Sequence, residues 1–173
     1  MSLLDEFQKI KTFVFDIDGV LTDGSLFIFE NGLYVRRMNI RDGFALQLAV
    51  KKGYRVVVIS GGDAEPVTHR LKKLGIENVF MKVENKLECL EAYLKQQELN
   101  WEQVLFMGDD IPDYHVMKMC GMPCCPADAA SEIKHISKYI SFQKGGDGAA
   151  RDVLEKVLKL NGHWDLDTGI ASK

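Results

Sequence analysis

The sequence lacks the features that would place it in a membrane or on nucleic acid. No apolar run approaches the roughly 20 residues of a membrane-spanning helix, and acidic residues precede the first hydrophobic stretch. Lys and Arg number 22 against 25 Asp and Glu, so the net charge of −3 provides no general basic field for a phosphate backbone. We therefore expect a cytoplasmic protein that binds neither membrane nor nucleic acid.

Cysteine is also scarce. The sequence has four cysteines, with no C-x-x-C spacing and no histidine at metal-ligand spacing: Cys89, Cys120, Cys124 and Cys125. This pattern argues against a zinc site and against a disulfide framework. We expect reduced, buried thiols that pack as small hydrophobic side chains.

The chain length of 173 residues leaves room for one domain. Its composition, 46% hydrophobic and 27% charged, is typical of globular proteins. We place the domain at residues 1–162. Residues 163–173 lose hydrophobic periodicity, and we expect them to form a mobile tail.

Short apolar or β-branched runs alternate with amphipathic stretches along the chain. The expected strands are 11–16, 54–60, 78–81, 104–108, 122–125 and 139–142. The expected helices are 42–52, 64–74 with Asp63 as its N-cap, and a third carrying Leu87, Leu90 and Leu94 at helical spacing. The alternation predicts the α/β class, a doubly wound, Rossmann-like parallel sheet.

One segment, about residues 25–39, interrupts this alternation. Apolar and polar residues alternate there on both sides of Asn31-Gly32, a dipeptide typical of hairpin turns in which both positions have positive φ. The sequence therefore predicts a β-hairpin that projects from the first crossover.

Polar residues follow several of the expected strands. Asp16 and Asp18 follow the first, Ser60-Gly61-Gly62 the second, and Asp109, Asp110 and Asp113 the fourth, while Lys86 opens the helix after the third. Ligands of open parallel sheets bind outside the carboxyl ends of the strands, so these groups are expected to meet at one edge. Crowded carboxylates require a cation, and hard oxygen ligands favour Mg²⁺.

This set of groups predicts phosphoryl transfer. Mg²⁺ shares its coordination with waters and substrate phosphate, so Asp16, Asp109 and a backbone carbonyl would suffice, and we include Asp18 in the metal site. The hydroxyl of Ser60 and the ammonium group of Lys86 would stabilise the remaining phosphoryl oxygens.

The order of these residues resembles the four motifs of the haloacid dehalogenase superfamily of phosphatases. The similarity extends from Lys11 to Leu158, where DGVLTDG, NIRDGF, NKL, GDDIPDYHVM and GGDGAARDV look like the 3-deoxy-D-manno-octulosonate 8-phosphate phosphatases. That family lacks a cap domain and acts in lipopolysaccharide sugar synthesis.

The resemblance implies a mechanism and a magnesium cofactor. Asp16 would attack phosphorus to form an aspartyl-phosphate, and Asp18 would act as general acid and then as general base. The chain must turn after Asp18 for both carboxylates to reach one phosphoryl group, and Gly19 makes such a turn feasible. Asp110 and Asp113 are expected to support the site from behind the metal ligands.

The resemblance also implies substrate binding by the residues of the NIRDG stretch, namely Asn39, Ile40, Arg41, Asp42 and Gly43. Arg70 would bind the carboxylate of a sugar acid, and Arg151 would also reach the substrate. The same NIRDG stretch can also be the start of a helix capped by Asp42, and a helix start beside Arg41 suits an anion, so both interpretations can hold at once. The family commonly has a basic residue where this sequence has Gly62, which leaves the particular sugar acid open.

The motif spacing leaves no room for a lid domain, so another copy of the chain is expected to cover the site. The resemblance implies a homotetramer with shared active sites, in which the hairpins assemble a central barrel. Residues 145–148 could then enter a neighbouring active site or their own; the alternative is an ordinary flexible turn.

Three alternatives remain open at this point. The substrate could be a nine-carbon, sialic-acid-type sugar acid phosphate. The chain could be a non-catalytic, phosphatase-like oligomerisation module, against which the intact Asp16, Asp18, Lys86 and Asp109 argue. It could also be a phosphoryl-accepting switch, which would show a stable phosphoaspartate without turnover.

Overall fold

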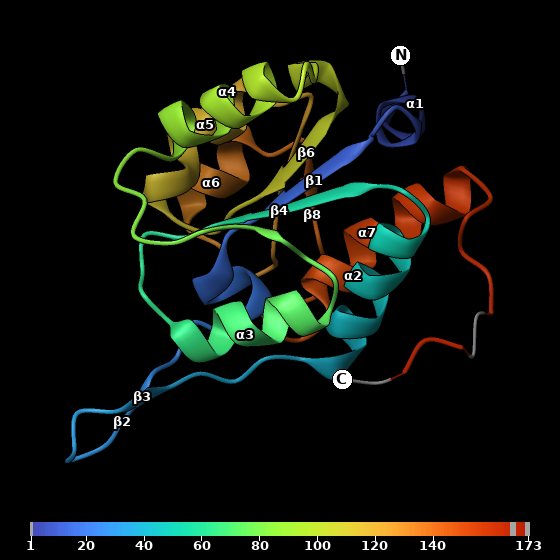
Figure 1. Ribbon diagram of the computed structural model, residues 1–173. Helices are drawn as coiled ribbons and strands as arrows, with labels where there is room; N and C mark the ends of the chain where they lie inside the picture. Colours follow the sequence, from blue (N-terminus) through green and yellow to red (C-terminus); the bar gives the residue numbers. More distant parts are fainter. Residues whose placement is uncertain (1, 167–168, 172–173) are drawn as a thin grey trace.

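A six-stranded parallel sheet forms the centre of the protein (Figure 1). The structure, a computed structural model, describes residues 2–166 and 169–171. The strand order is β5-β4-β1-β6-β7-β8, with bounds β1 Thr12–Phe15, β4 Arg55–Ile59, β5 Asn78–Phe80, β6 Val104–Met107, β7 Met122–Cys125 and β8 Tyr139–Ile140. The predicted α/β class with a doubly wound parallel sheet is confirmed.

Helices cover both faces of this sheet (Figure 1). The bounds on one side are α1 Leu3–Gln8, α2 Ile40–Lys51, α3 Glu65–Lys73 and α7 Ala149–Leu160, and on the other α4 Lys86–Gln96, α5 Tyr114–Met119 and α6 Ser131–Ile136. No helix of the described residues is long and apolar enough to span a bilayer.

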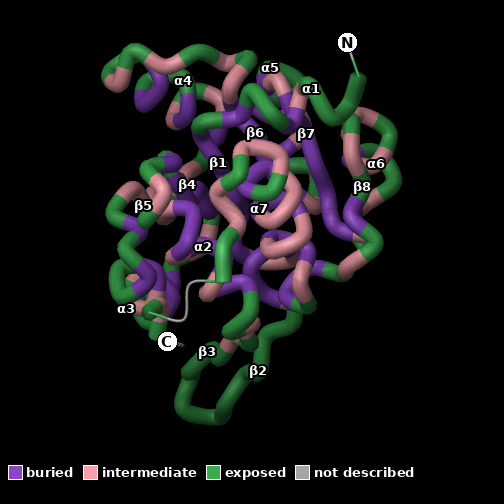
Figure 2. The backbone as a smooth tube through the Cα atoms, turned by 90° about the vertical axis from the view of Figure 1, so that its right-hand side faces the viewer, coloured by how far each residue is buried: buried purple, intermediate pink, exposed green. Residues whose placement is uncertain are grey.

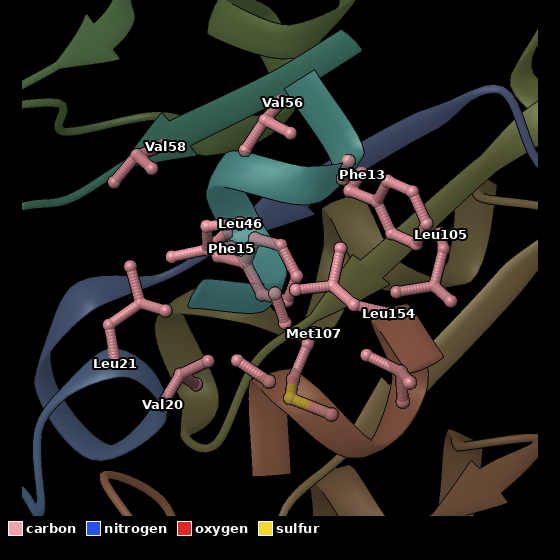
Figure 3. Close-up of a cluster of buried hydrophobic side chains, with 14 of the residues drawn as sticks. Phe13, Phe15, Val20, Leu21, Leu46, Val56, Val58, Leu105, Met107 and Leu154 are labelled. Carbon is pink, nitrogen blue, oxygen red and sulfur yellow. The ribbon is translucent and has the colours of Figure 1, made fainter. Parts of the chain in front are cut away.

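The central strands β1, β6 and β7 are buried at every position and are mostly apolar, because helices cover both faces of the sheet there. Alternate residues of β1 belong to different cores: Phe13 and Phe15 pack with α2 and α7, whereas Val14 packs with α4. Figure 3 shows the first of these cores, which also takes in Val20 and Leu21 from the loop that follows β1. Burial of these two side chains anchors that loop to the sheet.

The helix starts differ from the sequence predictions. The side chain of Asn39, and not that of Asp42, caps α2 by accepting the N–H groups of Arg41 and Asp42. The N-cap position of α3 is Ala64, which offers no side-chain cap, and Asp63 before it pairs with Lys82 at 2.7 Å. The N-cap predictions failed because α2 begins earlier, at Ile40, and α3 begins later, at Glu65, than the sequence patterns indicated.

The predicted hairpin is present and projects away from the sheet (Figures 1 and 2). Strand β2 Phe27–Ile28 pairs antiparallel with β3 Tyr34–Val35. Gly32 has a positive φ of 82°, but Asn31 does not. The prediction of a positive φ was therefore correct for Gly32 and wrong for Asn31. The N–H of Phe29 bonds the carbonyl of Leu33, which leaves a three-residue turn in place of a two-residue one.

The described part of the expected tail contacts α2 and Tyr54, the residue before β4. His163 Nδ1 lies 2.9 Å from the hydroxyl of Tyr54, and the ring of Trp164 packs edge-on against Phe44. The first residues of the expected tail therefore lie against the domain, and the mobility of the tail stays a prediction. Residues 167–168 and 172–173 of that tail lie outside the described residues.

The two chain positions at which a lid would be inserted hold short connections. Between β1 and α2 lies the hairpin, and between β4 and β5 lies α3. Neither connection forms a separate cap in the described residues.

Candidate active site

A cavity of about 320 Å³ opens at the carboxyl ends of β1, β4 and β6. It brings together most of the residues that the sequence placed at strand ends. Its lining is Asp16, Asp18, Gly24, Ser60, Gly61, Gly62, Val83, Lys86, Asp109, Asp110 and Pro112. Parallel strands deliver their carboxyl ends to one edge, which is why residues so far apart in sequence meet here.

The chain turns sharply after Asp18. Asp16 directly follows β1, and Gly19 has a φ of 84°, so the backbone turns where the sequence predicted. A Cβ at Gly19 would overlap the carboxylate of Asp109, which lies directly against the glycine. Glycine is therefore required both by the left-handed conformation and by the close approach of Asp109.

Lys86 joins Asp16 and Asp113 in a buried cluster. Its Nζ lies 2.7 Å from Asp113 Oδ1 and 3.0 Å from Asp16 Oδ1. Burial lowers the pKa of Lys86, but the two carboxylates outweigh burial and the net pKa is raised. Lys86 therefore stays charged beside Asp16.

The carboxylates of Asp16, Asp109 and Asp113 form a cluster that fits a metal ion. Each offers an oxygen within 4.8 Å of the others. Burial, followed by the charges of neighbouring carboxylates, raises the pKa of Asp16 and that of Asp109. Asp109 Oδ1 is buried without a hydrogen-bond partner among the described residues, as a ligand atom facing a cation would be.

Asp113 and Asp110 shape the loop after β6. Asp113 Oδ2 accepts the N–H of Asp109 at 3.0 Å while Oδ1 binds Lys86. Asp110 caps the short helical turn Ile111–Asp113 and accepts the N–H of Ile111. Asp113 is fully buried, so it acts on the cavity through Asp109 and Lys86.

Asp18 and Ser60 also line the cavity. Asp18 Oδ1 accepts hydrogen bonds from Thr22 Oγ1 at 3.1 Å and from Arg36 Nε at 2.9 Å. Ser60 Oγ accepts the N–H of Gly62 at 3.2 Å and is buried. Both side chains therefore hold fixed positions at the cavity wall.

Arg36 is a site residue that sequence reasoning missed. It follows β3, and its side chain is only 11% exposed although arginines at the base of a hairpin are usually solvated. The one available signal was a basic residue placed just after an apolar strand of the hairpin. That signal is too common to identify a site.

The expected substrate-binding residues do not line the cavity of Asp16 in this chain. Arg70 lines a separate cavity of about 510 Å³ under the hairpin, beside Arg36. Asn39, Arg41 and Arg151 line another, of about 530 Å³, at the N-terminal ends of α2 and α7. Ile40 is exposed, and Gly43 packs closely against Arg70.

Asp42 is buried and lines none of these three cavities. Its Oδ1 accepts the backbone N–H of Arg151 at 2.9 Å, and the backbone N–H groups of Arg151 and Gly148 both lower its pKa. Asp42 thus supplies the capping carboxylate that α7 lacks at Gly148. Burial outweighs these hydrogen bonds and raises the pKa of Asp42 to about 6.

Residues 145–148 pack on the loop after β1 of the same chain. The N–H of Gly146 bonds the carbonyl of Val20 at 2.9 Å, and a Cβ at Gly145 would overlap the carbonyl of Gly19. The two leading glycines therefore support the catalytic loop of their own chain, and entry of the segment into a neighbouring site stays a prediction.

The comparison with known families defines the class of protein. A family of haloacid dehalogenase-like hydrolases matches residues 75–152. The 3-deoxy-D-manno-octulosonate 8-phosphate phosphatase KdsC of Escherichia coli (strain K12) is 32% identical over 162 residues, which are 94% of this chain and 86% of that protein.

Two solved structures are similar over the whole fold. The 3-deoxy-D-manno-octulosonate 8-phosphate phosphatase of Moraxella catarrhalis, in complex with magnesium, phosphate and KDO, has a TM-score of 0.88 and 29% identity, covering 91% of this chain and 90% of its own. The cobalt-bound enzyme of Haemophilus influenzae has a TM-score of 0.88 and 30% identity, covering 95% and 96%. The chain belongs to the 3-deoxy-D-manno-octulosonate 8-phosphate phosphatase family of haloacid dehalogenase-like hydrolases.

Proposed function

We propose that this protein hydrolyses 3-deoxy-D-manno-octulosonate 8-phosphate to inorganic phosphate and the free sugar acid, a step of lipopolysaccharide sugar synthesis. The observation that carries the proposal is the cavity in which Asp16 meets Lys86, Asp109, Asp18 and Ser60. These are the groups that an aspartyl-phosphate mechanism requires. The kinship to KdsC over most of both chains supports the eight-carbon substrate.

In the first step Asp16 is the nucleophile. A carboxylate oxygen of Asp16 forms a bond to phosphorus while the bond from phosphorus to the sugar oxygen breaks. The electron pair of the broken bond goes to the sugar oxygen, which takes a proton from Asp18. Asp16 is then an aspartyl-phosphate and Asp18 a carboxylate.

In the second step Asp18 takes a proton from a water molecule. The water oxygen bonds phosphorus, and the bond between phosphorus and Asp16 breaks with its electron pair on Asp16. Both residues return to their starting states, and inorganic phosphate is released. The turn at Gly19 is what allows Asp16 and Asp18 to serve one phosphoryl group.

Asp16 and Asp109 would hold Mg²⁺ through their carboxylates, which lie in one cluster, and Asp18 would contribute its backbone carbonyl. The orphaned Oδ1 of Asp109 and the raised pKa values of Asp16 and Asp109 fit a bound cation. Bound Mg²⁺ supplies positive charge that stabilises the phosphoryl oxygens during transfer. Lys86 supplies a second positive charge, and Ser60 donates a hydroxyl hydrogen to the same group.

The assembly that we propose is a homotetramer with shared active sites. The hairpin exposes a run of large apolar side chains, more than solvent-facing strands of a monomer usually carry: Leu26, Phe27, Ile28, Phe29, Leu33, Tyr34 and Val35. A two-stranded ribbon is marginal in water, so contact with other hairpins would stabilise it. In such an assembly, Arg41, Arg70 or Arg151 of one chain would reach the active-site cavity of a neighbouring chain. None of the three lines the active-site cavity of its own chain.

We further propose that the enzyme acts in the cytoplasm and binds no nucleic acid. The four cysteines are free thiols, and three of them are buried, which suits a reducing compartment. The net charge of −3 supports the absence of a nucleic-acid partner.

The proposed function is tested by phosphate release from eight-carbon and nine-carbon 2-keto-3-deoxy sugar acid phosphates. We expect turnover of the eight-carbon ester with Mg²⁺ and its loss with a chelator. Preference for the nine-carbon ester would reassign the substrate, and hydrolysis of neither would contradict the proposal.

A further inference from the structure

The catalytic loop, residues 16–22, contacts two segments that are distant in the sequence. Thr22 forms an isolated antiparallel bridge with Met38, at the exit of the hairpin. Gly146 packs so closely on the end of the loop that a Cβ there would overlap the backbone of Thr22 and Asp23. Backbone from three parts of the chain therefore meets here. We call these parts the loop stack: residues 22–23, 37–38 and 145–147.

Arg37 binds a carboxylate from each of the other two parts of the loop stack. Its Nε donates to Asp23 Oδ2 at 3.0 Å, and its Nη2 donates to Asp147 Oδ1 at 3.0 Å. The two carboxylates lie 14 and 110 positions from Arg37 in the sequence. Because the guanidinium group is planar and rigid, two bonds from different nitrogens fix the relative position of the two carboxylates. Arg37 therefore holds the three parts of the loop stack together.

The carboxylate of Asp23 is a fixed partner for Arg37. Its Oδ1 accepts the backbone N–H of Ser25 at 2.9 Å. This hydrogen bond, followed by the one from Arg37, lowers the pKa of Asp23, so the carboxylate stays charged at neutral pH. A single exposed ion pair contributes little to stability, but one cation that joins two carboxylates forms a network. The bridge is therefore able to bias the position of the loop.

The part of the loop stack that carries Asp147 also supports the catalytic loop directly. The N–H of Gly146 bonds the carbonyl of Val20 at 2.9 Å, and a Cβ at Gly145 would overlap the carbonyl of Gly19. These two carbonyls belong to the residues that directly follow the catalytic carboxylates. A shift of Asp147 would therefore reach the backbone that carries the nucleophile.

We propose that Arg37 is a positioning residue of the phosphatase, which keeps residues 145–147 against the catalytic loop and thereby holds Asp16 in place for attack on phosphorus. The inference rests on the proposed function and adds to it a link between the hairpin and the catalytic loop. Arg37 does not line the active-site cavity, so it acts through Asp23 and Asp147 and not on the substrate. A movement of the hairpin would reach Asp16 by the same route.

The first test measures kcat and KM of magnesium-loaded, full-length Arg37→Met with p-nitrophenyl phosphate. This ester reports phosphomonoester cleavage without any contact to a sugar. We expect kcat to fall about 5-fold, because the nucleophile is misplaced in part of the molecules. KM should change by less than about 2-fold, because Arg37 does not touch the substrate. Arg37→Lys keeps the charge and should restore part of kcat.

The second test, hydrogen exchange, measures the loop stack directly and needs no activity. In Arg37→Met the amide of Gly146 and the amides of the catalytic loop should exchange about 5-fold faster than in the wild type. Asp147→Asn should raise the same exchange rates and lower kcat. The double variant should be no worse than Arg37→Met alone, because both substitutions remove the same interaction.

Lys138→Met is the matched control. The Lys138 side chain is 46% exposed, against 50% for Arg37. Its ammonium group also joins two distant segments, since it lies 2.6 Å from Glu6 Oε2 and 2.8 Å from the carbonyl oxygen of Gly121. Neither partner belongs to the loop stack. Loss of this bridge should leave kcat and the exchange of the loop stack unchanged.

The outcomes separate this inference from the proposed function. Unchanged kcat or unchanged exchange at Gly146 in Arg37→Met, or equal losses in Lys138→Met, would overturn the positioning role. A loss confined to KM would also overturn it, because it would show direct contact with the substrate. A wild type that hydrolyses no phosphomonoester contradicts the reaction itself, and the exchange rates then still decide whether Arg37 holds the catalytic loop.

Discussion

Lys86 Nζ lies 3.0 Å from Asp16 Oδ1 in a part of the cleft where both side chains are largely withdrawn from solvent. Asp113 holds the same ammonium group from its other side at 2.7 Å. One cation therefore lies between the nucleophile and a fully buried carboxylate. Its removal should affect both stability and catalysis.

Lys86→Met should destabilise the protein and slow the reaction. The substitution leaves two buried carboxylates without their cation, and breaking a buried ion pair in this way costs about 3–5 kcal/mol. Urea unfolding in the presence of a chelator measures the loss of the free energy of unfolding. We also expect a fall in kcat of about 100-fold, because one charge facing the phosphoryl group is lost.

Lys82→Met is the matched control for that measurement. Lys82 pairs with Asp63 on the surface, where both side chains are well exposed. Its loss should leave the unfolding midpoint and kcat nearly unchanged. Equal destabilisation by the two variants would contradict the structural role given to Lys86.

Asp42→Asn should stabilise the protein at neutral pH. Burial raises the pKa of Asp42 to about 6 from an ordinary 3.8, so the folded state retains a proton that the unfolded state has released. Stability from this group is thus present at low pH and is lost as the pH rises from about 4 to about 6. At pH 7 the cost of the buried charge is on the order of 3 kcal/mol.

The asparagine keeps a carbonyl oxygen for the N–H of Arg151 but carries no charge. Denaturant unfolding at pH 4, 5, 6 and 7 should show a flatter pH dependence for Asp42→Asn than for the wild type. Asp63→Asn, at an exposed position, should leave the pH dependence unchanged. A variant that is less stable than the wild type at pH 7 would show that the carboxylate charge stabilises the start of α7.

Ile28→Glu should disrupt assembly without disturbing the fold of one chain. The Ile28 side chain in the hairpin is 71% exposed. A charge at this position would be solvated in a free chain, but in an assembly it would be buried against apolar side chains. Sedimentation velocity should show a tetramer for the wild type and smaller species for the variant. Leu166→Glu, at a position 94% exposed and outside the hairpin, is the control. A wild type that sediments as a fully active monomer would remove the tetramer from the account.

The sheet and the main catalytic residues could be predicted from the sequence because they depend on local patterns. Apolar runs define buried strands, and a parallel order carries every strand's carboxyl end to one edge. The meeting of Asp16, Ser60 and Asp109 follows from these two facts. The roles assigned to them in catalysis stay predictions until variants are measured.

Other features depend on contacts between distant segments, and no local pattern encodes them. Asp42 looked like the cap of its own helix, yet it caps α7 through Arg151, 109 positions away. Arg36 reaches Asp18 across 18 positions because the hairpin folds back to the sheet edge. The expected substrate-binding residues belong to the same sequence motifs as the active-site residues. In a single chain, however, they do not line the active-site cavity.

The central claim is that Asp16 is the nucleophile of a magnesium-dependent phosphatase acting on an eight-carbon sugar acid phosphate. The most direct test is phosphate release from 3-deoxy-D-manno-octulosonate 8-phosphate, measured for the wild type and for Asp16→Asn. An unchanged circular dichroism spectrum would show that the variant keeps its fold. The account predicts turnover by the wild type with Mg²⁺ and none above background by the variant. Retained hydrolysis by Asp16→Asn, or none by the wild type, would contradict it.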